Sequence, residues 1–245
     1  MSGEIVVRAC KGLEEFRACV VLQREIWGEA DLEIVPDTIF VVAGHTGGQI
    51  LGAFDGERLI GFTLSMPGLR SGAPYLHSHM TGVRAEYRDR GVGRMLKLLQ
   101  RDEALSRDIR LIEWTFDPLE MRNAHFNLNR LGAISRRYQP NLYGITSSPL
   151  HRGLATDRLV AEWYLDSPRV LAALNGELAN PEFADSLEIP STLEHWKQSD
   201  LARVQQLQGA IRAKFSEEFA KGYAALGVAR TAQGSAYQLA PWSEF

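Results

Sequence analysis

Apolar residues near the start of the chain follow two different spacings, and each spacing predicts a different element. Residues 4 to 10 form a short β-branched run that predicts a strand, and residues 13 to 27 carry apolar side chains at helical spacing. Residues 28 to 47 are interrupted by glycine and proline. This stretch therefore predicts a loop with one short helix near residues 37 to 42.

The next apolar runs predict an antiparallel meander. Runs at residues 49 to 54 and 58 to 66 flank Asp55-Gly56, a dipeptide typical of tight hairpins. Residues 73 to 83 add a third strand in the same series. We therefore expect three neighbouring antiparallel strands.

Helices and strands alternate after this meander. Val92, Met95, Leu96 and Leu99 recur at steps of three and four, which predicts an amphipathic helix over residues 92 to 107. The remaining elements of this part are a strand at 111 to 118, a helix at 119 to 132 ending at Gly132, and two strands within 133 to 145 and 157 to 165.

This order of elements indicates an α/β (α+β) fold with a mixed, mostly antiparallel central sheet flanked by helices, in a domain over residues 4 to 166. Residues 167 to 245 form a C-terminal extension that starts with an acidic, loop-like stretch. A long amphipathic helix with Ser199 or Asp200 as its N-cap follows, and then a terminal β-hairpin around Gln233-Gly234. We expect the extension to pack on the core; the sharper alternatives are that it covers an acceptor site or forms a homodimer interface.

Composition and charge limit the classes of binding partner that we expect. The 245 residues are 45% hydrophobic and 23% charged, with a net charge of −3, so there is no overall basic field for nucleic acid. Cys10 and Cys19 are the only cysteines, which we expect to be buried apolar residues in a cytoplasmic protein. No apolar run is long enough for a membrane span, and no cluster has metal-ligand spacing.

The most informative stretch is the Arg-rich and Gly-rich turn before the helix at 92 to 107. Two glycines in the first helical turn let the backbone N–H groups approach a bound group closely, and these groups have no partner within the helix. The helix dipole adds positive character there. With three arginines around it, the turn predicts a site for a small phosphate-bearing ligand: Arg88, Arg90, Gly91, Gly93 and Arg94.

This turn and the order of elements resemble the GNAT superfamily of acyl-CoA-dependent N-acyltransferases. The family's phosphate-loop pattern, Arg/Gln-x-x-Gly-x-Gly/Ala, is matched by residues 88 to 93, and Val83 matches its lead-in. The resemblance covers residues 4 to 166. It implies acetyl-CoA or another acyl-CoA as cosubstrate, direct attack by an amine on the thioester, and no metal.

The resemblance also implies which residues hold CoA. The strand edge at Thr81 to Val83 would bind the pantetheine arm, with Gly82 permitting a local bulge, and Asn123 would contact the CoA chain. The full set it implies is Thr81, Gly82, Val83, Arg88, Arg90, Gly91, Val92, Gly93, Arg94 and Asn123. The chain departs from the family at Leu128, where many members carry a tyrosine that protonates the leaving thiolate. Another group or solvent would then supply that proton.

Candidates for the base that removes the ammonium proton come from two strands. His77 and His79 lie on one face of the strand before the turn, and Glu113 and Asp117 share a face of the next strand. Our candidates are His79, Asp117 and Glu113. The alternatives are that the histidines are hydrogen-bonded sheet residues and that Asp117 shapes the turn before Pro118.

The family builds its acceptor pocket from the loops that correspond here to residues 28 to 47 and 144 to 157. Arg152 or Arg158 would suit a substrate carboxylate, so we expect a small amine or amino-acid-like acceptor. Other polar residues in or near the second loop are Tyr138, Tyr143, Ser147, Ser148 and His151. Two alternatives remain: a catalytically silent acyl-CoA-binding or regulatory module, and an enzyme with a larger donor such as succinyl-CoA.

Overall fold

The computed structural model describes residues 4 to 28, 30, 33 to 148, 152 to 178 and 183 to 242. The chain forms two compact units. Unit 1 comprises Met1–Glu113 with Ser147–Leu150, and unit 2 comprises Trp114–Thr146 with His151–Phe245. The two are described separately below.

The sheet of unit 1 is built on the predicted meander. In the order of the sheet its strands are β1 (Ile5–Ala9), β2 (Gln49–Asp55), β3 (Arg58–Arg70), β4 (Ala73–Val83) and the first part of β5 (Leu111–Phe116). Neighbours are antiparallel except for β4 and β5, which are parallel. Gly56 turns the β2–β3 hairpin with a φ of 60°, a left-handed conformation that glycine adopts without strain. The three predicted strands are confirmed.

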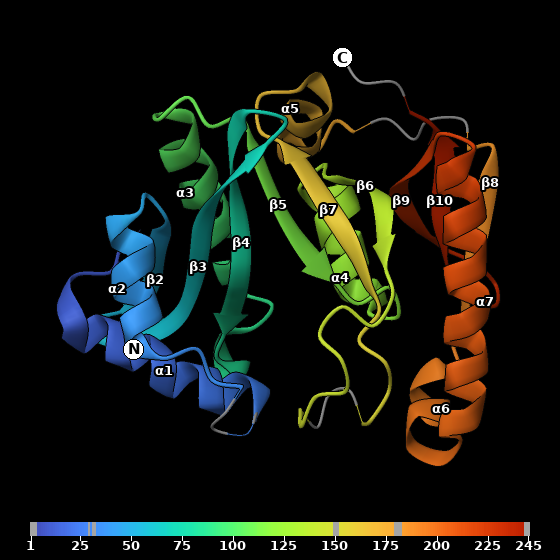
Figure 1. Cartoon of the computed structure of the whole chain (residues 1–245), viewed down its shortest axis with the longest axis horizontal. Helices are drawn as coiled ribbons and strands as arrows, with labels where there is room; N and C mark the ends of the chain where they lie inside the picture. The colour runs from blue at the N-terminus through green and yellow to red at the C-terminus, as the bar shows by residue number, and fades with distance from the viewer. Residues whose placement is uncertain (1–3, 29, 31–32, 149–151, 179–182, 243–245) are drawn as a thin grey trace. The chain divides into compact units, whose positions relative to one another are not determined.

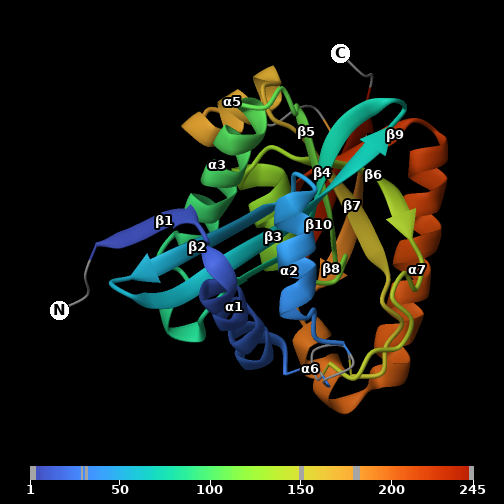
Figure 2. The same cartoon turned by 60° about the vertical axis from the view of Figure 1, so that its left-hand side comes forward.

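Helices cover both faces of these strands (Figures 1 and 2). Helices α1 (Gly12–Trp27) and α2 (Asp37–His45) pack on one face, where Phe40, Phe62 and Leu64 are fully buried. The short 3-10 helix η1 (Ala85–Tyr87) leads into α3 (Val92–Leu105), which packs on the other face. The predicted helices of this part are confirmed.

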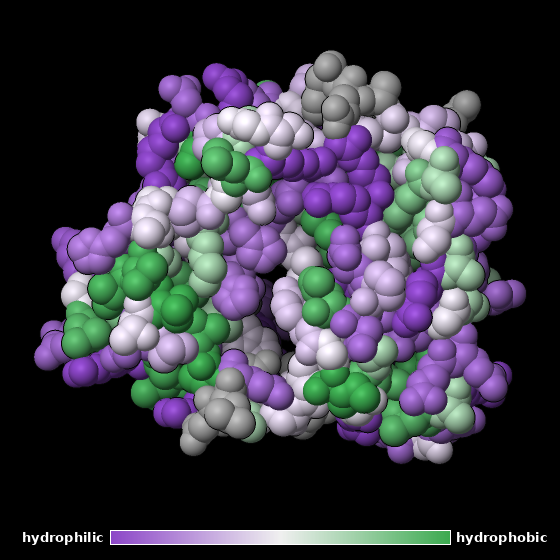
Figure 3. All heavy atoms as spheres, viewed as in Figure 1, coloured by the Kyte–Doolittle hydropathy of each residue, from purple (hydrophilic) through white to green (hydrophobic). Residues whose placement is uncertain are grey.

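Helices α1 and α2 each expose apolar side chains among polar ones. Val21 on α1 is 51% exposed and Val42 on α2 is 54% exposed. Figure 3 shows hydrophobic residues gathered over these two helices. The described residues of unit 1 therefore leave apolar side chains exposed there, on the side opposite α3.

Unit 2 carries an antiparallel sheet that includes three strands of the predicted extension. In sheet order its strands are β7 (Arg158–Tyr164), β6 (Ile134–Gln139), β9 (Tyr223–Arg230), β10 (Gly234–Pro241) and β8 (Asp185–Pro190). The pair Ser135 and Ala225 joins β6 to β9. The terminal hairpin β9–β10 is confirmed, and it continues the same sheet as β6 and β7 (Figure 1).

The helices of unit 2 are α4 (Met121–His125), α5 (Pro168–Asn175), α6 (Leu193–Ser199) and α7 (Leu201–Ala220). Asp200 is the N-cap of α7, and its Oδ1 accepts a hydrogen bond from the Arg203 N–H at 3.1 Å. Phe215 on α7 packs against Tyr138 and Tyr237, with ring centroids 5.8 and 5.1 Å away. The apolar stripe of this helix is thus covered by the sheet of unit 2.

Three details of unit 2 differ from the sequence prediction. The predicted helix 119 to 132 is the short α4 followed by a π-helical turn, η2 (Phe126–Arg130). The acidic, loop-like stretch contains the strand β8, because apolar Leu187 and Ile189 alternate with exposed polar residues there and are buried. The helices α5 and α6 were also missed. The predicted boundary after residue 166 lies inside unit 2 and stays a prediction.

Candidate active site

The turn at residues 88 to 94 has the backbone conformation of an open helix start. Asp89 and Gly91 both have positive φ, at 62° and 79°, and Gly91 is the N-cap of α3. A glycine N-cap has no side-chain oxygen to accept from the first-turn N–H groups, which also have no carbonyl partner within the helix. The turn therefore offers backbone donors and the positive end of the α3 dipole to an anion.

Gly91 and Gly93 are glycines for different reasons. The left-handed φ of Gly91 would strain any side chain there. Gly93 lies in the first turn of α3 without a positive φ, and a Cβ built on it meets no atom within 4 Å. Neither backbone conformation nor packing within the described chain calls for glycine at position 93. Glycine at position 93 leaves the first-turn N–H groups open to close approach by a bound group.

Cationic side chains surround this turn. Arg88 and Arg90 are exposed, and the Arg90 guanidinium lies 5.0 Å from the centre of the Tyr87 ring. The Arg88 Nε lies 3.4 Å from the Val83 carbonyl oxygen, a long contact that holds the side chain only weakly. Arg88 can therefore reorient toward a bound anion at small cost, whereas Arg90 is partly engaged.

Strand β4 runs beyond its pairing with β5. The parallel pairs join Leu76 to Ile112 and His77 to Glu113, while β4 continues to Val83. Against β3, Leu64 pairs with Met80 and Ser65 with Ser78, so one residue is left over. His79 is therefore a β-bulge, two residues beyond the pair His77–Glu113.

The prediction that Gly82 permits the bulge is wrong. Gly82 pairs regularly with Phe62 on β3. A Cβ on Gly82 would come within 2.7 Å of the Ile26 Cδ1 and 2.9 Å of the Trp27 Cη2. Glycine at this position is required by the close packing of α1 on β4. Whether Thr81 to Val83 contact pantetheine stays a prediction.

The two histidines lie together in unit 1. The ring centroids of His77 and His79 are 6.1 Å apart, and both residues are half-buried. Burial lowers the pKa of both imidazoles below the usual 6.5; for His77 the charges of His79 and Lys97 lower it further, while Glu113 raises it. Near pH 7 both rings are therefore neutral and able to accept a proton.

Glu113 is held in an ion pair. Its side chain is 6% exposed and accepts a hydrogen bond from the Arg70 guanidinium at the end of β3. This ion pair already engages the Glu113 carboxylate. Among the candidates of unit 1, the imidazoles are thus better suited to take a proton.

Asp117 belongs to unit 2 and has a structural contact. Its Oδ1 accepts a hydrogen bond from the Leu119 N–H at 2.8 Å, which is the turn-shaping role considered from the sequence. Burial raises the pKa of this carboxyl, while the Leu119 hydrogen bond and the nearby Arg158 act in the opposite direction. A role for Asp117 as base stays a prediction.

The helix α4 and the turn after it contain two further predicted positions. Asn123 is exposed on α4, as a ligand-binding side chain must be, and its contact with CoA stays a prediction. Leu128 is fully buried in η2 and cannot donate a proton. In the same unit the Tyr143 hydroxyl lies 3.0 Å from the Thr115 Oγ1 on β5.

The two loops expected to form the acceptor pocket meet in unit 1. The Ser147 Oγ accepts from the Ala30 N–H at 3.0 Å, and the Ser147 N–H donates to the Glu33 Oε1 at 2.8 Å. In unit 2, Arg152 donates to the Lys197 carbonyl oxygen, and Arg158 is buried beside the Tyr143 ring. His151 lies outside the described residues. A carboxylate-binding role for either arginine stays a prediction.

Lys97 was not singled out by the sequence, although it lies at the centre of a buried polar cluster in unit 1. The Lys97 Nζ donates to the Ser78 Oγ at 2.8 Å and the Gln100 Oε1 at 3.0 Å. Met95 and Leu99, expected on the buried face of α3, are half-buried, whereas Lys97, Gln100 and Ala104 are buried. The only local sign of this polar cluster in the sequence was the spacing of Lys97 and Gln100 by three residues, which places them on one face of the helix.

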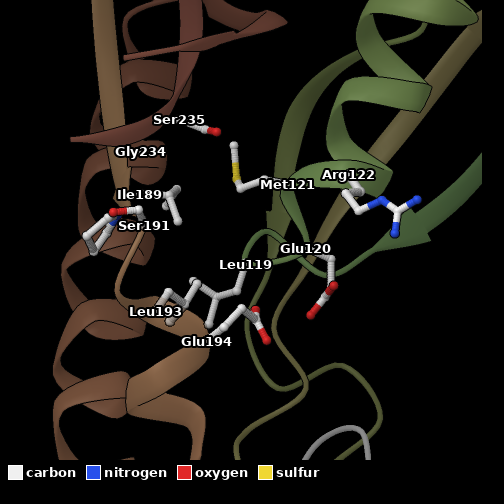
Figure 4. Close-up of a pocket in the computed structure, with 11 residues that line it drawn as sticks. Leu119, Glu120, Met121, Arg122, Ile189, Ser191, Leu193, Glu194, Gly234 and Ser235 are labelled. Atoms are coloured by element: carbon white, nitrogen blue, oxygen red, sulfur yellow. The ribbon is translucent and has the colours of Figure 1, made fainter. Parts of the chain in front are cut away.

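A pocket of about 410 Å³ lies within unit 2, at the start of α4 (Figure 4). Met121 extends from α4 toward Ser235 on β10, and Leu193 and Glu194 line the side formed by α6. Glu120 and Glu194 both accept hydrogen bonds from the Lys197 ammonium, at 2.6 and 2.9 Å. The pocket thus combines apolar side chains with acidic and basic ones, and its lining does not favour one chemical class of acceptor.

The described residues add two general findings. No group of three or more His, Cys, Asp or Glu side chains among them is placed to hold a metal ion. Of the helices within the described ranges, none has the length and hydropathy needed to cross a membrane.

Comparison of the structure with solved structures identifies the fold. An acetyltransferase of the GNAT family from Streptococcus pneumoniae matches with a TM-score of 0.51 and 12% identity, over 65% of this chain and 98% of that one. The chain has the GNAT acetyltransferase fold. The fold expected from the sequence is thereby confirmed.

Two plant proteins with this fold extend the comparison. NAA60 from Arabidopsis thaliana, solved with acetyl-CoA, matches with a TM-score of 0.54 and 14% identity, over 66% of this chain and 99% of that one. Naa50 from the same plant, solved with the bisubstrate analogue CoA-Ac-MVNAL, matches with a TM-score of 0.51 and 16% identity, over 64% and 97%. No family model and no curated protein matches the sequence.

Proposed function

We propose that this chain is an N-acyltransferase that moves an acyl group, acetyl by default, from an acyl-CoA to a primary amine. The observation that carries the proposal is the open space at Gly93, in the first turn of a helix with a glycine N-cap and exposed arginines. The fold supports it, since proteins with this fold have been solved with acetyl-CoA or a CoA-containing analogue.

The CoA pyrophosphate binds the N–H groups of the turn at residues 90 to 94, and Arg88 supplies a charge-assisted contact. The pantetheine arm follows β4 beyond its pairing with β5, along Thr81 to Val83. Asn123 contacts the same arm. These assignments follow the family resemblance.

The reaction needs one base and no covalent enzyme intermediate. The amine nitrogen attacks the thioester carbonyl carbon, the new C–N bond forms, and the C–S bond breaks to release CoA thiolate. The ammonium proton passes to a neutral imidazole, with His79, the bulged residue of β4, as the first candidate. The thiolate takes its proton from another group or from solvent, and its pKa near about 8.5 makes it a fair leaving group.

The acceptor is a primary amine, for which we favour a small amine or an amino-acid-like molecule. The bisubstrate analogue in Naa50 carries a peptide, so a peptide N-terminus belongs among the acceptors to be tested. A homodimer and a cytoplasmic location are further expectations of this proposal.

Release of free thiol from acetyl-CoA tests the activity. We would measure it with a panel of small amines, amino acids and short peptides, and with succinyl-CoA as a second donor. Thiol release that depends on an amine supports the enzyme. Tight CoA binding with thiol release at background for every amine and donor would favour the catalytically silent acyl-CoA-binding module instead.

A further inference from the structure

A buried ammonium group lies directly beneath the bulge of β4. Lys97 on α3 has 4% of its surface exposed, and its Nζ donates to the Ser78 Oγ and to the Gln100 Oε1. Ser78 is the residue just before the bulged His79, and is itself buried. Lys97 therefore contacts β4 at the first residue beyond its pairing with β5.

The same cluster holds the other side of the bulge. The Gln100 Nε2 lies 2.9 Å from the Ser65 Oγ and 3.3 Å from the Thr63 Oγ1. Thr63 in turn donates to the Met80 carbonyl oxygen at 3.0 Å. Met80 follows His79, so hydrogen bonds that lead back to Lys97 and Gln100 fix the residues on both sides of the bulge.

Burying a lysine is costly unless its hydrogen bonds are satisfied, and a shorter apolar side chain would fill the same space at lower cost. Simple packing of α3 on the sheet does not call for lysine at position 97. Lysine at position 97 is explained by a need to hold Ser78 in one position, because a bulged strand has lost part of the ladder of backbone hydrogen bonds that normally fixes it.

We propose that Lys97 is a positioning residue for the acyl transfer: through Ser78 it fixes the bulge of β4 and thereby places the His77 and His79 imidazoles and the adjacent backbone. This role rests on the proposed function. Lys97 touches neither cosubstrate nor acceptor in this account and acts only through β4.

The charge of Lys97 also reaches the imidazoles. It contributes to the lowered pKa of His77, while Glu113 acts in the opposite direction. The other charged groups near the cluster are Arg70, paired with Glu113, and Glu103, whose Oε2 lies 3.5 Å from the Gln49 Nε2. Loss of the ammonium should therefore raise the pKa of His77.

The test compares Lys97→Met and Ser78→Ala with the wild type and with Lys11→Met, which removes an exposed lysine of the same unit. We would measure CoA affinity by calorimetry and kcat and KM for the best amine across pH. For Lys97→Met and Ser78→Ala we expect kcat to fall at least tenfold and CoA affinity to change less than threefold. In the double variant the two losses should not multiply.

The titration of His77 separates positioning from a merely structural role. For Lys97→Met the His77 imidazole, followed by NMR, should titrate at higher pH than in the wild type, whereas loss of folded protein lowers kcat without moving that titration. If Lys97→Met does not fold, Ser78→Ala decides, because it keeps the lysine and its contact with Gln100.

Two results would overturn the inference, and they differ. If the wild type transfers acyl groups and both variants behave like Lys11→Met, the positioning role is wrong and the proposed function stands. If the wild type shows neither CoA binding nor thiol release, the proposed function fails and the role of Lys97 fails with it.

Discussion

Lys97→Met should remove a pH dependence of stability that the wild-type chain shows above neutral pH. Burial lowers the pKa of Lys97 to about 7 in the folded chain. In an unfolded chain a lysine titrates near about 10.4. Between these values the unfolded chain keeps a proton that the folded chain has released, so raising the pH favours the folded state. Below pH 7 both states hold the proton and the contribution is constant.

The size of the effect follows from this difference. One full proton changes the free energy of unfolding by about 1.4 kcal/mol per pH unit. With a folded pKa of about 7 the difference is half a proton at pH 7 and nearly one at pH 9. Over that interval the wild type should gain about 2 kcal/mol relative to a variant that cannot titrate at this position.

Urea unfolding at pH 7, 8 and 9 measures this directly. The wild type and Lys11→Met should change in parallel, since Lys11 is exposed in the same unit. The stability of Lys97→Met relative to the wild type should fall by about 2 kcal/mol over the same range, because all other titrating groups are shared. Parallel curves for the wild type and Lys97→Met would refute the buried, depressed lysine on which the reasoning depends.

Three further predictions test separate parts of the account. Arg88→Ala should weaken CoA binding by about ten- to a hundredfold, since a charge-assisted contact contributes about 1.5 to 3 kcal/mol, and calorimetry should show a smaller loss for Arg90→Ala. His79→Ala should lower kcat, and an unchanged kcat would exclude His79 as the base. Because burial lowers the pKa of His79, the activity of the wild type should persist somewhat below pH 6.5 and fall only as the His79 imidazole takes a proton. Asp200→Ala should reduce stability by about 1 kcal/mol in urea through loss of the α7 cap, without affecting CoA affinity.

Local patterns predicted most elements of this fold. Asp55-Gly56 fixed the β2–β3 hairpin, and Asp200 marked the start of α7, because a turn and a cap depend on a few neighbouring residues. The glycine and arginine pattern of the turn before α3 likewise lies within a few neighbouring positions. Residue types at fixed offsets were sufficient for the hairpin and the cap, whereas anion binding at the turn stays a prediction.

Features that depend on distant residues were missed or misplaced. The bulge lies at His79 and not at Gly82. Glycine stands at position 82 because the side chains of α1 pack closely against β4 there, a contact between residues far apart in the chain. The pairing of Arg70 with Glu113 joins residues far apart in the chain. The burial of Lys97 depends on Ser78 of β4, which accepts from its Nζ, and on Gln100, which is itself held by Ser65 of β3; no periodicity of α3 alone reveals these partners.

Calorimetry with CoA on three proteins tests the central claim most directly: the wild type, Gly93→Val and Gly209→Val. Both glycines lie in helices with nothing within 4 Å of an added Cβ, so both variants should fold and melt like the wild type. We expect the wild type to bind CoA in the presence of a chelator, Gly93→Val to bind at least tenfold more weakly, and Gly209→Val to bind like the wild type. CoA binding by Gly93→Val equal to that of the wild type, or no binding by the wild type at millimolar CoA, would contradict the account.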